Sequence, residues 1–217
     1  VHIVQGQIAY TQNISKATQA AIAKSDTWKQ GPITDVQFPV QDWAPIIRAL
    51  HESDCAAAMI DHWVAAELAA FAQQYASDPV EGQLVYLQYG PSQPEFLDLA
   101  GGAAEGMIWG TVYGVYADEK GNEFREKYKK KFPGIMGMVY TGGGYDAVYL
   151  LKDAWEKVGN TTDYDAVGDV IRAAEFRGVN GFYKFRPETQ SGISYPNMTD
   201  DPEAGQAHLI FQVQGDE

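Results

Sequence analysis

Residues 55–75 limit most strongly how this chain can fold, because they contain a complete strand, corner and helix. Residues 55–60 form an uninterrupted apolar run, which is typical of a strand buried on both faces. From Ala65 onward, small and apolar residues recur at helical spacing. Three polar or aromatic residues lie between the two segments: Asp61, His62 and Trp63. The stretch therefore predicts a buried strand, a polar-aromatic corner and a helix.

The same strand-to-helix unit recurs along the first half of the chain. Further strands are predicted at 1–4, 34–38, 84–87 and 106–111, and helices after Asn13 or Ser15, at 43–50 and at 95–99. Such units, spaced by about 25 to 30 residues, are typical of βαβ crossovers. The sequence thus predicts an α/β fold with a doubly wound parallel sheet.

The pattern changes in the second half, where helices dominate. Helices are predicted at 122–132, 145–158 and 164–176, and strands at 181–185 and 207–213. The expected inward residues are Phe124, Tyr128 and Phe132 on the first helix and Val167, Val170, Ile171 and Ala174 on the third. On the second helix, one apolar stripe contains Val148, Leu151, Trp155 and Val158. This part is expected to be an addition to a body different from the first.

Charge and missing motifs exclude several classes of function. A formal net charge of −13 argues against nucleic-acid binding, because phosphates require a positive surface. The sequence has no nucleophile elbow, phosphate-binding loop or H-E-x-x-H motif. Its single cysteine, Cys55, and its four histidines form no ligand-spaced cluster, so no metal or other cofactor is predicted. The glycines at 142–144 predict a flexible turn rather than an anion site.

Two features bear on the cellular location. No apolar run approaches the ~20 residues of a membrane helix. The first residues lack the pattern of a secretory signal, so we expect either a cytosolic protein or a processed or trimmed chain.

The corner at Asp61, His62 and Trp63 is a candidate ligand site. In open α/β sheets, small ligands bind beyond the carboxyl ends of the strands. A structural interpretation is also open: Trp63 would cap the core, and the other two residues would form a solvated pair or a helix N-cap. Taken alone, this corner favours the structural interpretation.

Three segments resemble the solute-binding proteins of branched-chain amino acid ABC transporters, which have the type I periplasmic binding fold. The segments are 89–106 (YGPSQPEFLDLAGGAAEG), 144–159 (GYDAVYLLKDAWEKVG) and 171–185 (IRAAEFRGVNGFYKF), the last followed by QAHLIFQVQ. The resemblance covers nearly the whole chain but only the second half of the family. It implies that residues 1–115 form the second lobe, that 116–205 supply helices and a strand of the first lobe with the crossovers, and that 206–217 return to the second lobe.

The resemblance also implies a function and a site. Such proteins lie in the periplasm or outside the cell, close around a solute and present it to a membrane permease, without catalysis. The implied ligand-binding residues are Tyr10, Asp61, His62, Trp63, Gln88 and Tyr89. Amino acid binders of the family commonly carry an acidic residue where this chain has Tyr89. A small polar or aromatic solute (amino acid, amide or related) is therefore expected, with Asp61 available as a partner for a cation.

Alternatives to this function remain, and the resemblance adds one expectation about partners. The alternatives are a cytosolic or receptor-type sensor of the same fold and an α/β enzyme. The chain is also expected to be a fragment or processed product, lacking the first lobe of the same protein. Helices 145–158 and 164–176 would then expose apolar surface, and an isolated fragment would self-associate.

Overall fold

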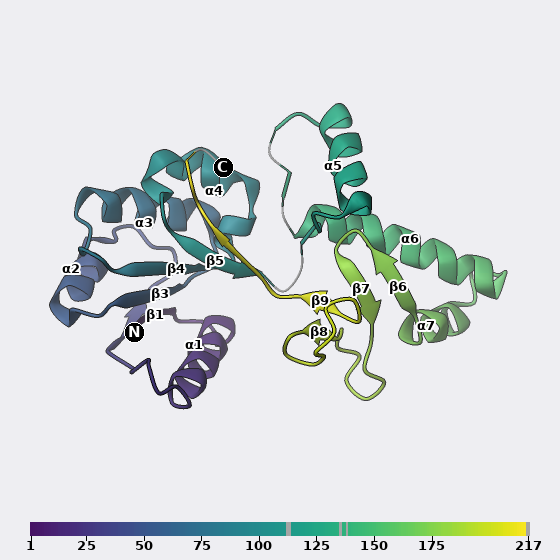
Figure 1. Cartoon of the computed structure of the whole chain (residues 1–217), viewed down its shortest axis with the longest axis horizontal. Helices are drawn as coiled ribbons and strands as arrows, with labels where there is room; N and C mark the ends of the chain where they lie inside the picture. The colour runs from purple at the N-terminus through teal and green to yellow at the C-terminus, as the bar shows by residue number, and fades with distance from the viewer. Residues whose placement is uncertain (112–113, 135, 138, 216–217) are drawn as a thin grey trace. The chain divides into compact units, whose positions relative to one another are not determined.

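The computed structural model describes residues 1–111, 114–134, 136–137 and 139–215. The chain divides into two compact units (Figure 1). Unit 1 consists of Val1–Gly110 and Ile210–Glu217, and unit 2 of Thr111–Leu209. The assignment of these units to the two lobes of a binding protein stays a prediction.

Unit 1 is built on a mostly parallel sheet that has six strands within the described residues, in the order β10-β5-β4-β3-β1-β2. The strands are β1 (His2–Gly6), β2 (Ile33–Val36), β3 (Ala57–Asp61), β4 (Leu84–Gln88), β5 (Ile108–Thr111) and β10 (Leu209–Gln212). The pairs β1-β2, β1-β3, β3-β4 and β4-β5 are parallel. The predicted parallel α/β sheet is confirmed.

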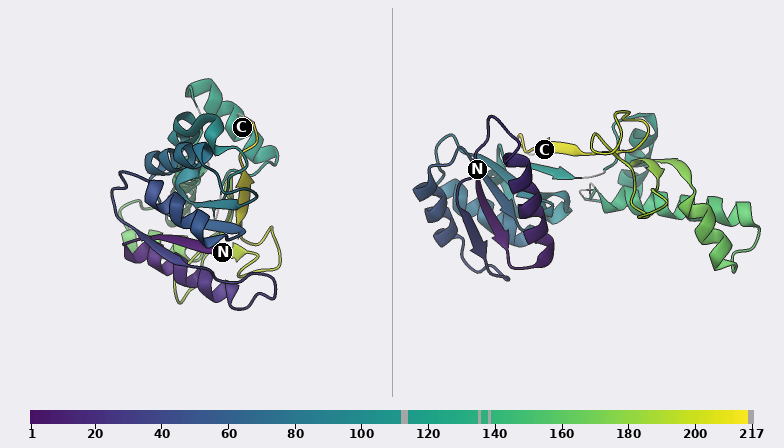
Figure 2. Two further views of the ribbon diagram at one scale, coloured as in Figure 1. Left: turned by 90° about the vertical axis from the view of Figure 1, so that its left-hand side faces the viewer. Right: turned by 90° about the horizontal axis from the view of Figure 1, so that it is seen from below.

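Helices cover both faces of this sheet. They are α1 (Ala9–Ile22), α2 (Ala44–Ser53), α3 (Ala65–Ser77) and α4 (Pro94–Ala100), with 3-10 turns η1 (Gly90–Ser92) and η2 (Gly101–Ala104). Neighbouring strand residues point to opposite faces. Ile60 therefore joins the core under α2 and α3, whereas Met59 meets Thr18 of α1. The first view of Figure 2 shows α1, in purple, on one side of the sheet and the blue helices on the other.

The core of unit 1 confirms the predicted buried stripe of α2. Trp43, Ile46, Ile47 and Leu50 are all buried, together with Leu68, Phe71, Leu87 and Phe96. The Trp43 ring packs edge-on against Phe71 with 5.1 Å between ring centroids, and its Nε1–H donates to the Glu67 carbonyl at 2.9 Å. The apolar side chains of α2 and α3 thus hold the loop before α2 against the helix that follows the corner.

Unit 2 combines three helices with two small pairs of strands in the part of the chain that the structure describes. The elements are α5 (Glu119–Lys131), α6 (Tyr140–Val158), α7 (Tyr164–Arg172), the antiparallel pair β6 (Glu175–Gly178) and β7 (Gly181–Lys184), and the parallel pair β8 (Ser194–Tyr195) and β9 (Gln206–Ala207). The buried Asp146 of α6 accepts hydrogen bonds from the amides of Val179 and Asn180 and from the Tyr183 hydroxyl. This carboxylate fixes α6 to the β6-β7 turn.

Several predicted helix limits are wrong, each for a physical reason. Helix α1 begins at Ala9, before Asn13 and Ser15, and Ile8 provides no side-chain cap. The glycines at 142–144 lie inside α6 and do not form a turn. A Cβ at Gly142 would lie 2.0 Å from Asn180 Oδ1, so this glycine lets α6 approach the β6-β7 turn. The predicted helix 164–176 ends at Arg172, because Phe176 belongs to β6.

The apolar stripe predicted on α6 is partly exposed in this chain, as expected for a helix of a fragment. Val148 is 66% exposed and Trp155 is 40% exposed, whereas Leu150 and Ala154 are buried. Asp146 sets this orientation, since Leu150 and Ala154 follow it at intervals of four residues on the same helix face. On α5, Phe132 is exposed although Phe124 is buried as predicted. Self-association through the exposed face of α6 stays a prediction.

Within the described residues, no helix is both long and apolar enough to cross a membrane.

Candidate ligand site

The predicted site residues of unit 1 follow the carboxyl ends of three neighbouring strands. Tyr10 lies in the first turn of α1, just after β1, while Asp61 ends β3 and Gln88 ends β4. His62 and Trp63 follow Asp61, and Tyr89 follows Gln88. Because β1, β3 and β4 are adjacent and parallel, all six residues lie along one edge of the sheet.

Tyr10 and Gln88 are joined directly. The Gln88 side-chain amide donates from Nε2 to the Tyr10 hydroxyl at 2.6 Å, although 78 residues separate them in sequence. Tyr10 remains 47% exposed, so its ring is available to a ligand. Gln88 Oε1 is buried and has no hydrogen-bond partner in the described structure. A solute that brings a donor to this edge would satisfy that oxygen.

The carboxyl group of Asp61 is completely buried on this edge. Neither of its oxygens has a hydrogen-bond partner among the described residues. Burial disfavours the charged form and raises the pKa of Asp61 to about 7. Burial likewise raises the pKa of the nearby Tyr86, and the charges of Asp61 and Tyr10 add to that increase. Asp61 is therefore not the solvated acid of the structural interpretation.

Replacing Asp61 with asparagine is expected to remove a pH dependence of stability. The pKa of Asp61 is raised from 3.8 to about 7 in the folded protein, so the folded state keeps a proton that the unfolded state releases. Stability should therefore fall as the pH rises from 4 to 7, by up to about 1.4 kcal/mol per pH unit. Urea unfolding of both proteins between pH 4 and 8 measures this. The free energy of unfolding of Asp61→Asn should rise relative to that of the wild type as the pH rises. If the two free energies change with pH in parallel, the raised pKa of Asp61 is contradicted.

His62 is buried and paired with an acid on α3. Its Nε2 lies 2.9 Å from Glu67 Oε2, and Glu67 also accepts from the Val40 amide. Burial lowers the pKa of His62, and the charge and hydrogen bond of Glu67 counteract this only in part. The N-cap of α3 is Val64, without a side-chain hydrogen bond, so the proposed capping role of His62 and Asp61 is wrong. His62 instead supports the aromatic residues beside it.

Trp63 belongs to an aromatic group that the sequence only partly indicated. Its ring lies 4.8 Å from His62 and 5.0 Å from Phe38, between ring centroids. Phe38 follows β2 and is 54% exposed. A Cβ at Gly6 would lie 3.3 Å from Trp63 and 3.2 Å from Thr11, so the end of β1 brings Trp63 close to the first turn of α1.

Sequence reasoning missed Phe38, Glu67 and Tyr86. Phe38 lies at the end of a predicted strand, so the rule that ligands bind beyond the carboxyl ends of parallel strands was sufficient to find it. Glu67 could not be recognised as a site residue, because it lies on the polar side of α3 and its partner His62 precedes that helix. Tyr86 lies inside β4, where alternation places it on the same face as Gln88.

Tyr89 has an unusual backbone conformation. Its φ of +52° is rare for residues other than glycine, and it directly precedes η1. The Tyr89 carbonyl accepts hydrogen bonds from the amide and hydroxyl of Ser92, which hold the turn. Backbone strain of this kind is concentrated at functional sites.

Two further features of the chain concern a second binding site. No group of three or more histidine, cysteine, aspartate or glutamate side chains in the described residues could hold a metal ion. A surface hollow of about 440 Å³ lies between α2 and α3, where Arg48, His51 and Asp78 line it. None of the six predicted ligand-binding residues lines that hollow.

A mostly parallel α/β unit with aromatic and polar side chains along its carboxyl edge is typical of proteins that bind small molecules. The chain belongs to the periplasmic binding protein family, whose sequence model matches residues 1–199. The predicted family and its type I fold are thus confirmed. No curated protein matches the chain.

Three solved structures illustrate the similarity. A protein from Silicibacter pomeroyi, assigned as a branched-chain amino acid ABC transporter, is 32% identical over 99% of this chain and 55% of its own, with a TM-score of 0.86. The leucine binding protein of Thermotoga maritima is 20% identical over 100% of this chain and 58% of its own, with a TM-score of 0.74. A solute-binding protein from R. palustris in complex with benzoate is 14% identical over 100% of this chain and 56% of its own, with a TM-score of 0.79. The chain therefore spans little more than half the length of these relatives, and the last two show the fold alone.

Proposed function

We propose that this chain is part of the solute-binding component of an ABC importer, and that unit 1 supplies one wall of the solute site. The observation that carries this proposal is the row of side chains along the carboxyl edge, in a member of the periplasmic binding protein family. Exposed aromatic rings and unpaired buried oxygens lie together there. Such groups contribute stacking and hydrogen bonds to a ligand that supplies the missing donors.

The proposed solute is small, planar or weakly polar. Tyr10, Phe38 and Trp63 offer aromatic faces, and Tyr89 supplies no charge to pair with an ammonium group. Asp61 is the one acid among the six predicted residues, and its raised pKa leaves it partly protonated near neutral pH. An aromatic amide, which brings both a ring and an N–H donor, fits these side chains better than an aliphatic amino acid does, because an ammonium group requires a fixed anion.

The remaining parts of the proposal concern the whole protein. It acts in the periplasm or outside the cell, binds and releases its solute without catalysis, and delivers it to a membrane permease. A first lobe from the same protein completes the site. The periplasmic binding protein family supports each of these statements for a longer protein that contains this chain.

A thermal-shift comparison of four solutes tests this function on that longer protein. Benzoate and benzamide carry a ring without an ammonium group, leucine carries an ammonium group without a ring, and phenylalanine carries both. A ligand that binds only the folded state raises the midpoint, by an amount that grows with the ligand concentration relative to Kd. We expect benzamide, which carries both a ring and an N–H donor, to give a larger shift than leucine. A larger shift with leucine would overturn the solute class, and no shift with any ligand of the four at millimolar concentration would count against the solute site.

A further inference from the structure

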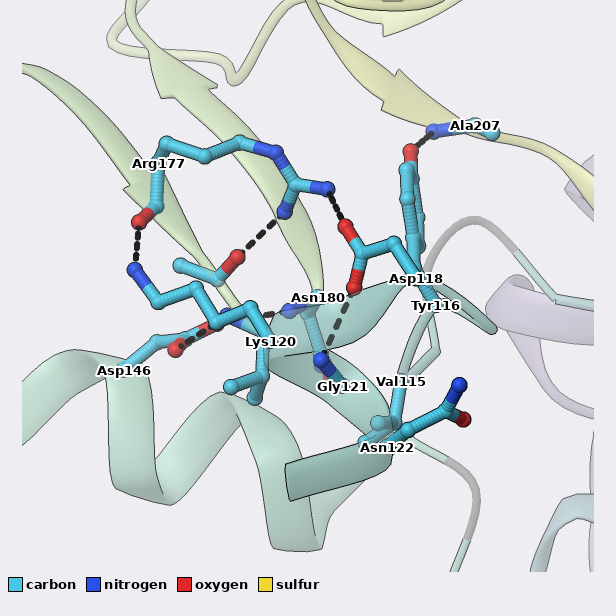
Figure 3. Close-up of polar contacts among 12 residues, drawn as sticks. Val115, Tyr116, Asp118, Lys120, Gly121, Asn122, Asp146, Arg177, Asn180 and Ala207 are labelled. Atoms are coloured by element: carbon cyan, nitrogen blue, oxygen red, sulfur yellow. Dashed lines mark hydrogen bonds and ion pairs between the residues drawn. The ribbon is translucent and has the colours of Figure 1, made fainter. Parts of the chain in front are cut away.

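Two segments of the chain connect the units, and both are held at one place in unit 2. The chain leaves unit 1 between Gly110 and Thr111 and returns between Leu209 and Ile210. Tyr116 lies shortly after the first of these points and Ala207 shortly before the second. The amide of Ala207 donates to the Tyr116 hydroxyl at 2.7 Å, across 91 residues of sequence (Figure 3).

The backbone of Tyr116 is also fixed to unit 2. Its amide donates to the Val179 carbonyl at 3.0 Å, next to the β6-β7 turn. Its carbonyl accepts from Arg125 Nη1 at 2.8 Å, and the Val115 carbonyl accepts from the other guanidinium nitrogen. These contacts join the first connecting segment, which contains Val115 and Tyr116, to α5 and to the β6-β7 turn.

The ring of Tyr116 is held by a charged pair. The guanidinium of Arg177 lies 4.8 Å from the ring centroid, a cation–π contact, and forms an ion pair with Asp118. Asp118 in turn caps α5 by accepting from the Gly121 amide at 2.8 Å. Figure 3 shows Arg177 and Asp118 facing one another beside the tyrosine. Ring, ion pair and helix cap thus fix the direction of the hydroxyl.

Two glycines leave room for this arrangement. A Cβ at Gly181 would lie 2.7 Å from the Tyr116 hydroxyl, and Gly181 has a φ of +104° that L side chains rarely adopt. A Cβ at Gly121 would lie 1.9 Å from the Tyr116 carbonyl oxygen. Any side chain at either position would displace the tyrosine.

We propose that Tyr116 is a positioning residue that clamps both connecting segments to the same part of unit 2, which is formed by α5 and the β6-β7 turn. The inference rests on the proposed function, because it concerns closure of two lobes around a solute. Hinges in such proteins are a few residues that absorb the change in backbone angles. With the clamp in place, the two segments are tied to unit 2 at one point and move together when the lobes close.

The test is Tyr116→Phe in the longer two-lobed protein, with Tyr183→Phe as the matched control. Each substitution removes one hydroxyl group within unit 2, but the Tyr183 hydroxyl donates to Asp146 of α6 and not to a backbone group of the connecting segments. We expect amide exchange at Ala207 to rise about 2- to 10-fold in Tyr116→Phe, the factor that loss of one hydrogen bond gives. We also expect a broader distribution of distances between spin labels on the two lobes without solute, and Tyr183→Phe should retain the wild-type distribution.

The distance distribution separates a hinge role from a merely structural one. Faster exchange at Ala207 with an unchanged distribution would overturn the proposal, because the hydrogen bond would then stabilise unit 2 without guiding the hinge. Equal broadening in both tyrosine variants would overturn it as well. These measurements use the protein without solute, so they stand even where no solute shifts the melting midpoint.

Discussion

Replacing Trp43 with alanine is expected to destabilise the protein by about 3–5 kcal/mol, the usual cost of removing a large aromatic side chain from a core. Trp43 is almost completely buried, packs edge-on against Phe71 and His62, and donates its Nε1–H to the Glu67 carbonyl. Its loss leaves a cavity between the loop before α2 and the start of α3. Urea unfolding, followed by hydrogen exchange of the β3 amides as a probe of unit 1, measures the change.

Trp43→Phe is the control for this substitution. It keeps an aromatic ring in the core but removes the indole donor, so it should cost clearly less than Trp43→Ala. A carbonyl that loses its partner in a buried place costs about 1–3 kcal/mol. A loss below 1 kcal/mol for Trp43→Ala would show that α2 does not pack as described.

Trp63→Ala is expected to weaken solute binding by about 2–4 kcal/mol, or roughly 30- to 700-fold in Kd. The indole packs beside both His62 and Phe38 at the carboxyl edge, and its removal deletes the largest aromatic face there. The measurement is calorimetric titration of the longer protein with the solute that gives the largest thermal shift. Such a loss would also establish that this edge, rather than the hollow between α2 and α3, holds the solute.

Trp28→Ala provides a matched control for the binding measurement. Trp28 is 45% exposed and precedes β2, at the amino end of the sheet, so its removal should leave Kd unchanged.

Tyr89→Phe should cost less binding free energy than Trp63→Ala, about 0.5–1.5 kcal/mol if its hydroxyl bonds the solute. Tyr89→Glu should shift preference toward α-amino acids, because it adds an anion for an ammonium group. Full affinity in Trp63→Ala would exclude the proposed site.

The regular part of unit 1 was predictable because local pattern and tertiary structure agree there. The apolar run before Asp61 forms β3, and the helical spacing after Ala65 forms α3. The same agreement placed the buried stripe of α2. A parallel sheet buried on both faces has strands that read as continuous apolar runs, and this signal is strong in a single sequence.

Unit 2 was less predictable because long-range contacts decide its details. Glycines favour a turn at 142–144, yet α6 runs through them, since Gly142 is where Asn180 packs against the helix. The face of α6 that is buried in this chain follows Asp146, a charged residue, whereas the apolar stripe with Val148 and Trp155 is exposed. Hydrophobic periodicity carries no information about a buried carboxylate that accepts backbone amides.

The candidate site was predictable in position but not in chemistry. The rule of carboxyl ends places Tyr10, Trp63 and Gln88 along one edge. It does not reveal that Gln88 donates to Tyr10 or that His62 pairs with Glu67. Nor does it show that Asp61 has no hydrogen-bond partner among the described residues and a raised pKa, because desolvation depends on every group packed around it.

The position of β10 beside β5 has a consequence for the nascent chain. The Gly106 amide donates to the Val213 carbonyl and the Val213 amide to the Met107 carbonyl, so the outer edge of β5 is covered by a segment made after all of unit 2. The rings of Trp109 and Phe211 stack there, 5.2 Å apart. During synthesis, β1 to β5 are complete while this edge still has unpaired backbone groups and a bare tryptophan, which are the features that invite pairing with another chain. The chain is therefore most prone to aggregate in the interval between completion of β5 and emergence of β10.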